Sequence, residues 1–331
     1  MRNTRAYISS VGMYVPEKCI TNEELARTVE TSDEWIRERT GIRERRIVAN
    51  GECNSDLSVK AIERCLEKAG VSSEEIDLII VPTVTPDMMF PSTACVIQEK
   101  LGASKAWGFD LSGACSGFLY ALSVGAQFVE NGHYKKVVVV GTDVMSSIID
   151  PQDRATCVLF GDGAGAVLLE PSENDGIGLL DFILRCDGSG GKHLNMPAGG
   201  SSMPASQETV EKRLHYVQQD GRSVFKFAVK YMAEVSKQIL ERNGVDVEQV
   251  KLFVPHQANL RIINSTANRL KLRNDQVAIN IDRYANTTSA TIPIGLCEYH
   301  EAGKIEKGDL VLLASFGAGF TWGSVLLRWG I

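Results

Sequence analysis

The amino-acid sequence predicts an α/β protein made of two similar halves. Runs such as Ile76 to Val81 are too short for helices, and their unbroken hydrophobicity is typical of strands buried on both faces. The order helix, glycine, strand, proline occurs in Cys65 to Pro82 and again in Ile239 to Pro255. We therefore expect a duplicated unit, with one half at residues 1–175 and the other at 176–331.

Two further repeats support this division. Gly165 to Glu170 resembles Gly323 to Arg328, and the strand-like run Lys136 to Gly141 resembles Asp309 to Ala314. Each half thus ends in a glycine turn and a strand. The halves should join near the polar, turn-rich stretch that begins at Pro171.

Composition limits the class of protein. The chain has 331 residues, of which 44% are hydrophobic and 23% charged, as in an ordinary globular protein. Its net charge of −6 argues against general nucleic-acid binding, and no apolar segment is long enough to span a membrane. The eight cysteines include no C-x-x-C pair, which argues against a zinc site and a disulfide framework. We expect a cytoplasmic protein with reduced thiols and no metal.

The first half opens with a predicted strand, Ala6 to Val15, and a helix that begins near Thr21. Thr31 and Glu34 have capping-box spacing, which predicts a short helix that starts there and ends at a glycine. Trp35 and Arg39 would share one face of it. They could stack on a flat aromatic ligand, or they could simply pack against the protein.

The central motif is a run of small residues around Cys115, between the predicted strand Ala106 to Leu111 and the apolar segment Phe118 to Val129. An amphipathic helix, Ser55 to Gly70, precedes this unit. The run is typical of a tight strand-to-helix turn. A thiol at a helix N-terminus is expected to be stabilised as the thiolate, the reactive form. The alternative is an inert, buried cysteine.

Partners for such a nucleophile lie in the second half. His256 directly follows a predicted buried strand, at the edge where open α/β sheets bind ligands. Asn286, after a predicted strand at Val277 to Ile281, could donate to an oxyanion or only bond a turn. The glycine-rich turn Phe316 to Gly323 could bring backbone N–H groups near a substrate, and the irregular stretch Asp187 to Gln219 is long enough to be functional.

A nucleotide-binding loop is not expected at Gly161 to Ala166. This stretch lacks the G-x-G-x-x-G spacing and precedes a strand instead of a helix.

At this point the motifs resemble one family closely, the 3-oxoacyl-[acyl-carrier-protein] synthase III enzymes, from about Ala6 to Trp329. The resemblance implies the thiolase fold, two similar α/β halves in a five-layered αβαβα arrangement. It rests on these segments: Thr31–Trp35 with Arg39–Arg43, Gly113–Phe118, Asp153–Arg154, Phe160–Ala166, Val254–Asn259, Asn286–Thr287 and Phe316–Gly323.

The resemblance also implies an activity. Cys115 would take an acyl group from acyl-CoA, with the backbone N–H groups of Cys115 and Ala318 as its oxyanion hole. His256 and Asn286 would hold the malonyl thioester while carbon dioxide leaves. The product would be a 3-oxoacyl-carrier protein at the start of type II fatty acid synthesis. No cofactor is implied, because coenzyme A enters only as a substrate thioester.

The family's binding residues can be carried over in the same way. Phe90 would reach into the acyl pocket of a second copy, which implies a homodimer. Coenzyme A would place its adenine between Trp35 and Arg154 and its phosphates near Arg39 and Arg261. Its pantetheine arm would pass Thr31, Gly221, Phe225, Ala258 and Asn259. The acyl pocket would include Phe90, Met145, Phe160 and Phe316, and the Phe316 ring would lie beside His256 and Asn286. The carrier protein would dock on a basic cluster of Lys226, Lys230, Arg261, Arg269, Lys271 and Arg273.

Some positions depart from the family's usual pattern, and other functions remain open. Arg222 replaces a small polar residue near the coenzyme site, while Ala285 and Thr288 replace a glycine and a serine beside Asn286.

A papain-like protease also uses Cys, His and Asn in this order, but the cysteine of such a protease lies near the N-terminus. The remaining alternatives are a thiolase-fold condensing enzyme of secondary metabolism and a non-catalytic acyl-CoA-binding protein.

Overall fold

The computed structural model describes residues 4–174 and 176–331. Its first sheet has the strand order β1-β7-β6-β4-β5. β4 is parallel to both β5 and β6, whereas β7 is antiparallel to β6 and to β1. The strands are β1 (Ala6–Tyr14), β4 (Leu78–Pro82), β5 (Trp107–Leu111), β6 (Val137–Asp143) and β7 (Gly163–Pro171).

The second sheet repeats this pattern with four strands in the order β11-β12-β13-β8. β11 and β12 are parallel, and the other two pairs are antiparallel, so β11, β12, β13 and β8 correspond to β4, β6, β7 and β1. The strands are β8 (Gly178–Cys186), β11 (Val250–Pro255), β12 (Leu310–Gly317) and β13 (Thr321–Arg328).

The strand predicted at Val277 to Ile281 is wrong. Only one bridge forms, between Val277 and Phe253 of β11. Beyond it, side chains take the backbone hydrogen bonds: the Gln257 amide donates to the Ala278 carbonyl at 3.1 Å, and the Tyr299 hydroxyl accepts from the Ile279 amide at 2.9 Å. The chain then turns into helix α9 instead of extending the sheet.

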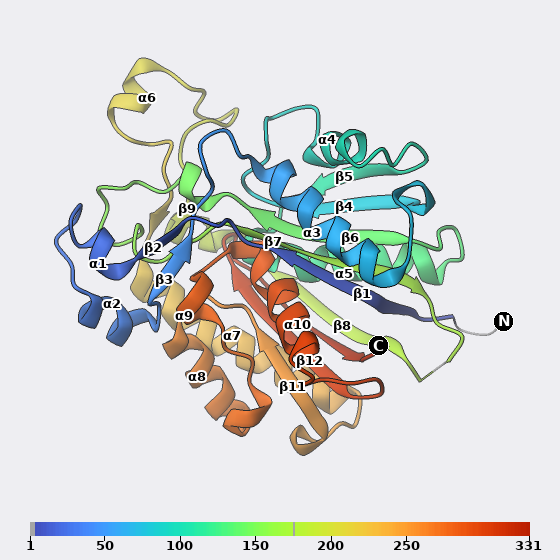
Figure 1. Cartoon of the computed structure of the whole chain (residues 1–331). Helices are drawn as coiled ribbons and strands as arrows, with labels where there is room; N and C mark the ends of the chain where they lie inside the picture. Colours follow the sequence, from blue (N-terminus) through green and yellow to red (C-terminus); the bar gives the residue numbers. More distant parts are fainter. Residues whose placement is uncertain (1–3, 175) are drawn as a thin grey trace.

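Helices form three layers around the two sheets (Figure 1). The middle layer holds α5 (Gly117–Glu130) and α10 (Thr291–Glu301), which contact both sheets. One outer layer holds α3 (Asn54–Ala69) and α4 (Thr93–Lys100) against the first sheet. The other holds α7 (Gly221–Arg242), which packs on the second sheet and on α8 (Leu260–Leu270). This is the predicted αβαβα arrangement.

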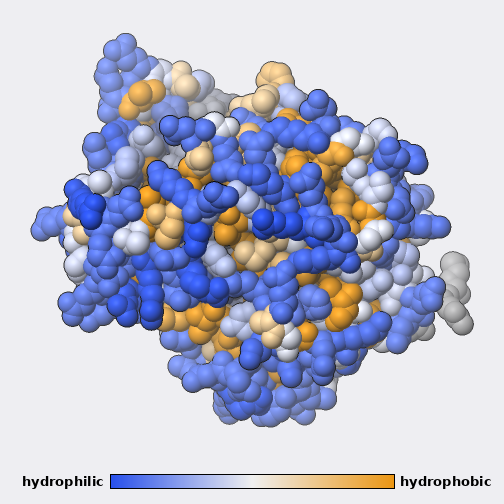
Figure 2. Space-filling view, in the orientation of Figure 1, coloured by the Kyte–Doolittle hydropathy of each residue, from blue (hydrophilic) through white to orange (hydrophobic). Residues whose placement is uncertain are grey.

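Shorter elements surround these layers, and the face seen in Figure 2 is mostly hydrophilic with smaller apolar patches. The stretch 187–219 was predicted to be irregular, yet it contains the β9–β10 pair and a short helix. The short elements are α1 (Asn22–Leu25), α2 (Asp33–Thr40), α6 (Gln207–Glu211), α9 (Ile281–Tyr284), β2 (Cys19–Thr21), β3 (Glu44–Arg46), β9 (Leu194–Asn195) and β10 (Gln218–Gln219).

The N-terminal cap of α2 corrects another prediction. Ser32, not Thr31, is the cap, and its hydroxyl accepts the backbone N–H of Trp35 at 3.1 Å. Ser32 has the extended backbone that a cap requires. The predicted stop is confirmed, because Gly41 follows the helix with a φ of +82°, a conformation that favours glycine.

Candidate active site

Cys115 lies in a 3₁₀ turn, Ala114–Ser116, between β5 and α5. The turn carries backbone strain, since Ala114 has a φ of +46°. The prediction of a stabilised thiolate is wrong for this structure. Burial raises the pKa of the Cys115 thiol to about 12, and the Asp143 carboxylate adds to this effect. The cost of desolvating the thiolate thus outweighs its stabilisation by the helix N-terminus, and the resting residue is a thiol.

The turn between β12 and β13 packs directly on the Cys115 backbone. A Cβ atom added to Gly317 would lie 2.8 Å from the Cys115 amide nitrogen. The Ser315 hydroxyl donates to the Cys115 carbonyl at 2.7 Å, and the Thr321 hydroxyl lies 3.0 Å from the Gly113 carbonyl. These contacts place Ala318 beside Cys115, where both line one cavity.

His256 follows β11 and is almost fully buried. Its backbone N–H donates to the Ala314 carbonyl at 2.8 Å, and its Nδ1 lies 2.7 Å from the Thr291 hydroxyl. Burial lowers the pKa of His256 to about 3, so the ring is neutral. Within the described residues, the buried Nε2 has no hydrogen-bond partner, which leaves it for a substrate.

The Thr291 hydroxyl governs which nitrogen of His256 carries the proton. It can donate to Nδ1, which places the ring proton on Nε2, or to the Thr288 carbonyl at 3.1 Å, which leaves Nε2 as an acceptor. The site can therefore present His256 either as a donor or as an acceptor toward the cavity.

We expect Thr291→Val to lower condensation by about 10–100-fold, because it removes a buried hydrogen bond that orients His256. Steady-state kinetics would measure this. Thr291→Ser keeps the hydroxyl and should recover most of the activity. Equal losses in both variants would show that packing, not the hydroxyl, matters.

Asn286 lies in a turn before α10 and lines a cavity that Cys115 and His256 also line. Its backbone bridges Phe160: its N–H donates to the Leu159 carbonyl at 3.0 Å, and its carbonyl accepts from Gly161 at 3.1 Å. Its side-chain oxygen accepts the Thr288 N–H at 2.9 Å. This bond orients the amide, so the NH₂ group remains for a substrate.

Strained residues flank Asn286. Ala285 has φ +57° and ψ −154°, a region that is essentially limited to glycine, and Thr288 has a φ of +54°. Such conformations persist only where the surroundings hold them. Here the Asp143 carboxylate accepts both the N–H and the hydroxyl of Ser289, at 3.1 and 2.8 Å.

We expect Ala285→Gly to stabilise the protein. Relief of strain is worth about 1–3 kcal/mol. The lost methyl and the greater freedom of the unfolded chain offset part of this, which leaves about 0.5–1 kcal/mol. Thermal unfolding would measure it. Ala290 is also buried but has an ordinary φ of −79°, so Ala290→Gly should destabilise. A fall in stability for both variants would contradict the strain argument.

Asp143 was missed by the sequence analysis. Its carboxylate also accepts the Val84 N–H at 2.8 Å and the hydroxyls of Thr83 and Thr85 at 3.0 Å. Burial raises the pKa of Asp143 against the effect of these bonds. The signal available was a carboxylate at the end of a buried, valine-rich strand. Thr291 offered no such signal, because threonine is ordinary near a helix start.

The coenzyme residues predicted for the pantetheine arm are mostly brought together. A cavity of about 190 Å³ contains Cys115, His256 and Asn286, and it is also lined by Arg39, Gly221, Phe225, Ala258 and Asn259. Thr31 does not line it, and the Thr31 hydroxyl is buried.

The predicted adenine site lies near the cavity's Arg39. The guanidinium groups of Arg39 and Arg154 lie 5.6 and 4.4 Å from the centre of the Trp35 ring, so Arg154 occupies the face where a second ring would stack. The guanidinium of Arg261 lies 5.4 Å from the Phe225 ring. In this structure, Trp35 and Phe225 are thus packed against arginine side chains of the protein.

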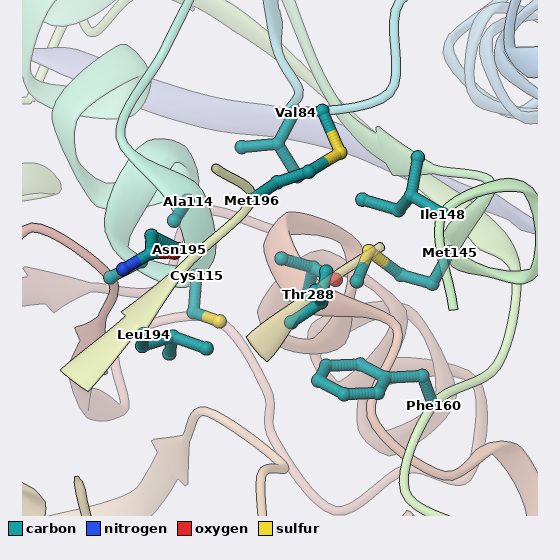
Figure 3. A pocket seen from close by; sticks show the side chains of 12 residues that line it. Val84, Ala114, Cys115, Met145, Ile148, Phe160, Leu194, Asn195, Met196 and Thr288 are labelled. Carbon is teal, nitrogen blue, oxygen red and sulfur yellow. The ribbon is translucent and has the colours of Figure 1, made fainter. Parts of the chain in front are cut away.

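An apolar cavity of about 210 Å³ opens from the Cys115 thiol (Figure 3). Met145 and Phe160 line it as predicted, and the stretch 187–219 contributes Leu194, Asn195, Met196 and Val217. The placement of Phe316 in this pocket is wrong. Phe316 lies on the His256 and Asn286 side of Cys115, because β12 directs it into the other cavity. Phe90 lies outside both, and is 85% exposed.

The six residues of the basic cluster are all exposed, on α7, on α8 and in the turn after α8. Arg273 pairs with Asp275 at 3.1 Å. Elsewhere, the described residues contain no group of three or more His, Cys, Asp or Glu side chains that could hold a metal ion. They also contain no helix with the length and apolarity to cross a membrane.

Comparison with known proteins agrees with this geometry. Residues 109–188 match the family described as 3-Oxoacyl-[acyl-carrier-protein (ACP)] synthase III, and residues 240–329 match its C-terminal part. The chain is 53% identical to beta-ketoacyl-[acyl-carrier-protein] synthase III of Koribacter versatilis over 326 residues, covering 98% of both chains. It is 54% identical to that of Solibacter usitatus over 327 residues, covering 98% of this chain and 99% of the relative.

A solved structure gives the same result. The 3-oxoacyl-[acyl-carrier-protein] synthase III of Aquifex aeolicus is 43% identical and superimposes with a TM-score of 0.91, covering 98% of this chain and all of the other. A papain-like protease is therefore excluded. The chain belongs to the 3-oxoacyl-[acyl-carrier-protein] synthase III family, whose members are condensing acyltransferases with the thiolase fold.

Proposed function

We propose that this chain condenses a short acyl-CoA primer with malonyl-acyl carrier protein through an acyl-Cys115 thioester, and so initiates type II fatty acid synthesis. The products are a 3-oxoacyl-carrier protein, coenzyme A and carbon dioxide. One observation carries the proposal: Cys115, His256 and Asn286 line one cavity, and an apolar cavity opens from the same thiol.

Acyl transfer comes first. The Cys115 sulfur attacks the thioester carbonyl of the primer, and the backbone N–H groups of Cys115 and Ala318 stabilise the oxyanion. The thiol must lose its proton, because burial disfavours the thiolate. Neutral His256 can accept that proton at Nε2 when Thr291 donates to the Thr288 carbonyl. Coenzyme A then leaves and takes up the proton.

Decarboxylation and condensation follow. The malonyl thioester carbonyl accepts hydrogen bonds from His256 Nε2 and from the Asn286 NH₂ group, which stabilise the enolate as carbon dioxide leaves. His256 is a donor at this stage when Thr291 donates to Nδ1. The new carbanion attacks the acyl carbonyl, and the Cys115 thiolate leaves and takes up a proton from solvent. All of these groups belong to the protein or the substrates, so no cofactor takes part.

Coenzyme A enters along the cavity of about 190 Å³ that Arg39, Phe225 and Asn259 line. Its adenine stacks between Trp35 and Arg154 once the Arg154 side chain moves off the ring, and its phosphates lie near Arg39 and Arg261. The pantetheine arm then passes the other residues of the cavity toward Cys115, with Thr31 beside its path.

The active form is a homodimer, in which Phe90 enters the acyl cavity of the partner. Phe90 and Met89 are 85% and 81% exposed, which is unusual for large apolar side chains. Among the described strands, β5 pairs with β4 on one side only and leaves a free edge. A second copy would cover both features.

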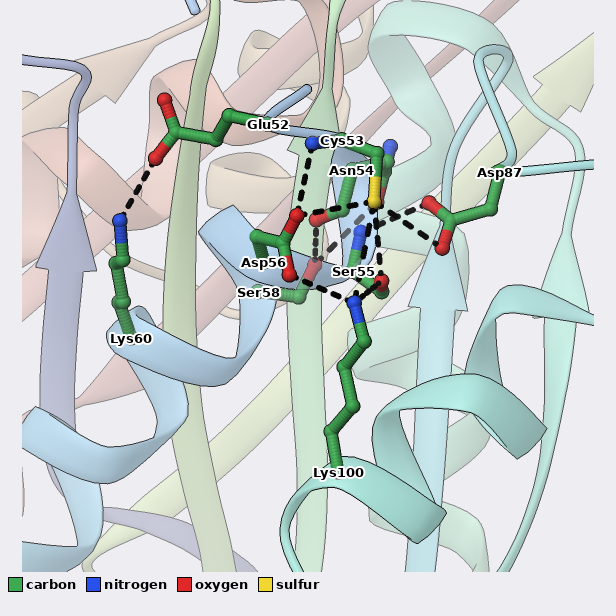
Figure 4. A network of polar contacts seen from close by, with 9 residues as sticks. All are labelled: Glu52, Cys53, Asn54, Ser55, Asp56, Ser58, Lys60, Asp87 and Lys100. Carbon is green, nitrogen blue, oxygen red and sulfur yellow. Dashed lines mark hydrogen bonds and ion pairs between the residues drawn. The ribbon is translucent and has the colours of Figure 1, made fainter. Parts of the chain in front are cut away.

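The segment that carries Phe90 is held firmly at its base (Figure 4). The Asp87 carboxylate accepts the Ser55 N–H at 2.9 Å at the start of α3, where Cys53 caps the helix. The Asn54 amide donates to the Thr85 carbonyl at 3.0 Å. Anchored in this way, the exposed segment is pre-organised for a partner.

The protein acts in the cytoplasm. Its chain consists of two thiolase-like halves, at 1–175 and 176–331. All eight cysteines are free, which suits a reducing compartment.

The acyl carrier protein docks on the basic cluster. Arg269→Glu should raise the KM for malonyl-carrier protein by about tenfold, because exposed charges act mainly on encounter with an acidic partner. Lys304→Glu makes the same charge change at an exposed site outside the cluster and should have little effect. Equal KM values for the two variants would place the docking site elsewhere.

Intact-mass spectrometry tests the function. The protein and its Cys115→Ala variant are incubated with a panel of acyl-CoAs and then with malonyl-carrier protein. We expect an acyl adduct on the unaltered protein alone, discharged as 3-oxoacyl-carrier protein. If no acyl-CoA labels Cys115, the proposal fails, and a binding role would be favoured. Discharge to a different product would indicate a condensing enzyme of secondary metabolism.

A further inference from the structure

A second cavity of about 290 Å³ lies behind the acyl cavity. Its inner part is buried and includes Ile149, Cys157 and Phe160. The buried Arg45 also lines it, and the Arg45 guanidinium donates to the Ile20 and Val158 carbonyls and to the Asn22 side-chain oxygen. Its rim carries exposed polar side chains of Lys18, Glu24 and Thr28. The cavity therefore runs from the protein interior, next to the acyl cavity, to solvent. The mechanism proposed above does not use it.

A single turn of chain separates the two cavities. Residues Met145–Ser147 form a 3₁₀ helix, in which side chains three positions apart share a face. Met145 and Ile148 accordingly line the acyl cavity, whereas Ser146 and Ile149 line the second. The wall is one segment thick.

The backbone of this wall is fixed. The Ser146 N–H and hydroxyl donate to the two carboxylate oxygens of the buried Asp162, at 2.8 and 2.6 Å. The Ile148 carbonyl accepts the Val217 N–H at 3.0 Å. These bonds hold the wall in place, so its movement does not join the two cavities. A side chain must therefore control the passage between them.

Phe160 is that side chain. Of the described residues that line the two cavities, it alone lines both. Its backbone is bridged to Asn286, so the ring is presented from a rigid position. Figure 3 shows the ring at the edge of the acyl cavity, near Met145 and Thr288.

We propose that the second cavity is an extension of the acyl site for linear apolar chains, closed in this protein by the Phe160 ring, which thereby sets the longest primer. The proposal rests on the function proposed above. A cavity of about 150 Å³ can hold benzene, and in the proposed homodimer the partner's Phe90 takes part of the acyl cavity of about 210 Å³, so this cavity accepts at most about six carbons. Longer chains meet the ring.

The test measures acylation of Cys115 by hexanoyl-, octanoyl-, decanoyl- and dodecanoyl-CoA in the unaltered protein and in Phe160→Ala and Phe160→Leu. Each methylene buried in the opened extension should raise the acylation rate constant by up to about fourfold. Labelling by dodecanoyl-CoA should rise at least about tenfold in Phe160→Ala, and less in Phe160→Leu. Circular dichroism and thermal unfolding show that each variant is folded.

A second substitution distinguishes acyl chains that enter the second cavity from acyl chains that only use the space left by the missing Phe160 ring. Leu25 lines only the second cavity and is half-buried, so Leu25→Trp can fill that cavity without touching Cys115. In the Phe160→Ala background, it should abolish the gain with dodecanoyl-CoA and keep hexanoyl labelling. Persistent dodecanoyl labelling would overturn the inference, as would a strong dodecanoyl reaction of the unaltered protein. If no acyl-CoA labels the unaltered protein, the proposed function itself fails.

Discussion

Replacing Asn286 by alanine should leave acyl transfer to Cys115 largely intact and lower condensation by about 100–1,000-fold. The loss equals that of one donor to a developing oxyanion in a buried site. The Asn286 NH₂ group is oriented by the bond from the Thr288 N–H to its side-chain oxygen. No backbone group replaces that donor, since the Asn286 N–H already donates to Leu159.

Two half-reactions should be measured for this variant. Acylation is followed by mass spectrometry with the primer alone, and decarboxylation by release of labelled carbon dioxide from malonyl-carrier protein. Asn264→Ala, which replaces an exposed asparagine on α8, serves as the matched control. If acylation and decarboxylation fall together, Asn286 supports the structure of the whole site and is not a donor to the enolate.

Gly317→Ala should lower both half-reactions by about 100-fold or more. The added Cβ would lie 2.8 Å from the Cys115 amide nitrogen and 3.0 Å from the Cys115 Cβ. These atoms belong to a tight turn held by the Ser315 hydroxyl, so they cannot move aside without shifting the nucleophile. A displacement of about 1 Å at a reacting group can cost about 100-fold.

A matched glycine makes this test specific. Gly188 has open space where a Cβ would be added, so Gly188→Ala should keep both the activity and the stability. Activity and thermal unfolding should be measured for both variants. Acylation of Gly317→Ala at the rate of the unaltered protein would show that the turn adapts, and that close approach at Gly317 is not needed for catalysis.

Local patterns predicted the elements that depend on neighbouring residues. The Gly41 stop, the helix that ends before Gly70 and the buried strand at β4 all follow from hydrophobic period and glycine placement. The duplication was visible because the same order of helix, glycine, strand and proline occurs twice in the sequence. Cys115 stood out because small residues on both sides of a cysteine are typical of a tight strand-to-helix turn.

Properties set by distant residues were missed. The Cys115 pKa depends on burial between two halves of the chain and on Asp143, which is 28 positions away in sequence. The Val277 strand is lost to side-chain bonds from Gln257 and Tyr299. The Phe316 side chain lies where β12 directs it in the assembled sheet, which is away from the acyl cavity.

The sequence by itself predicted the fold class from hydrophobic runs and repeats, and its motifs resembled one family, which marked Cys115, His256 and Asn286 as the candidate catalytic residues. Tertiary structure alone decided the protonation of Cys115, the two hydrogen-bond choices of Thr291 and the position of Phe160 between two cavities. The physical reason is that desolvation, buried hydrogen bonds and cavity walls are made by groups that meet only when the chain is folded.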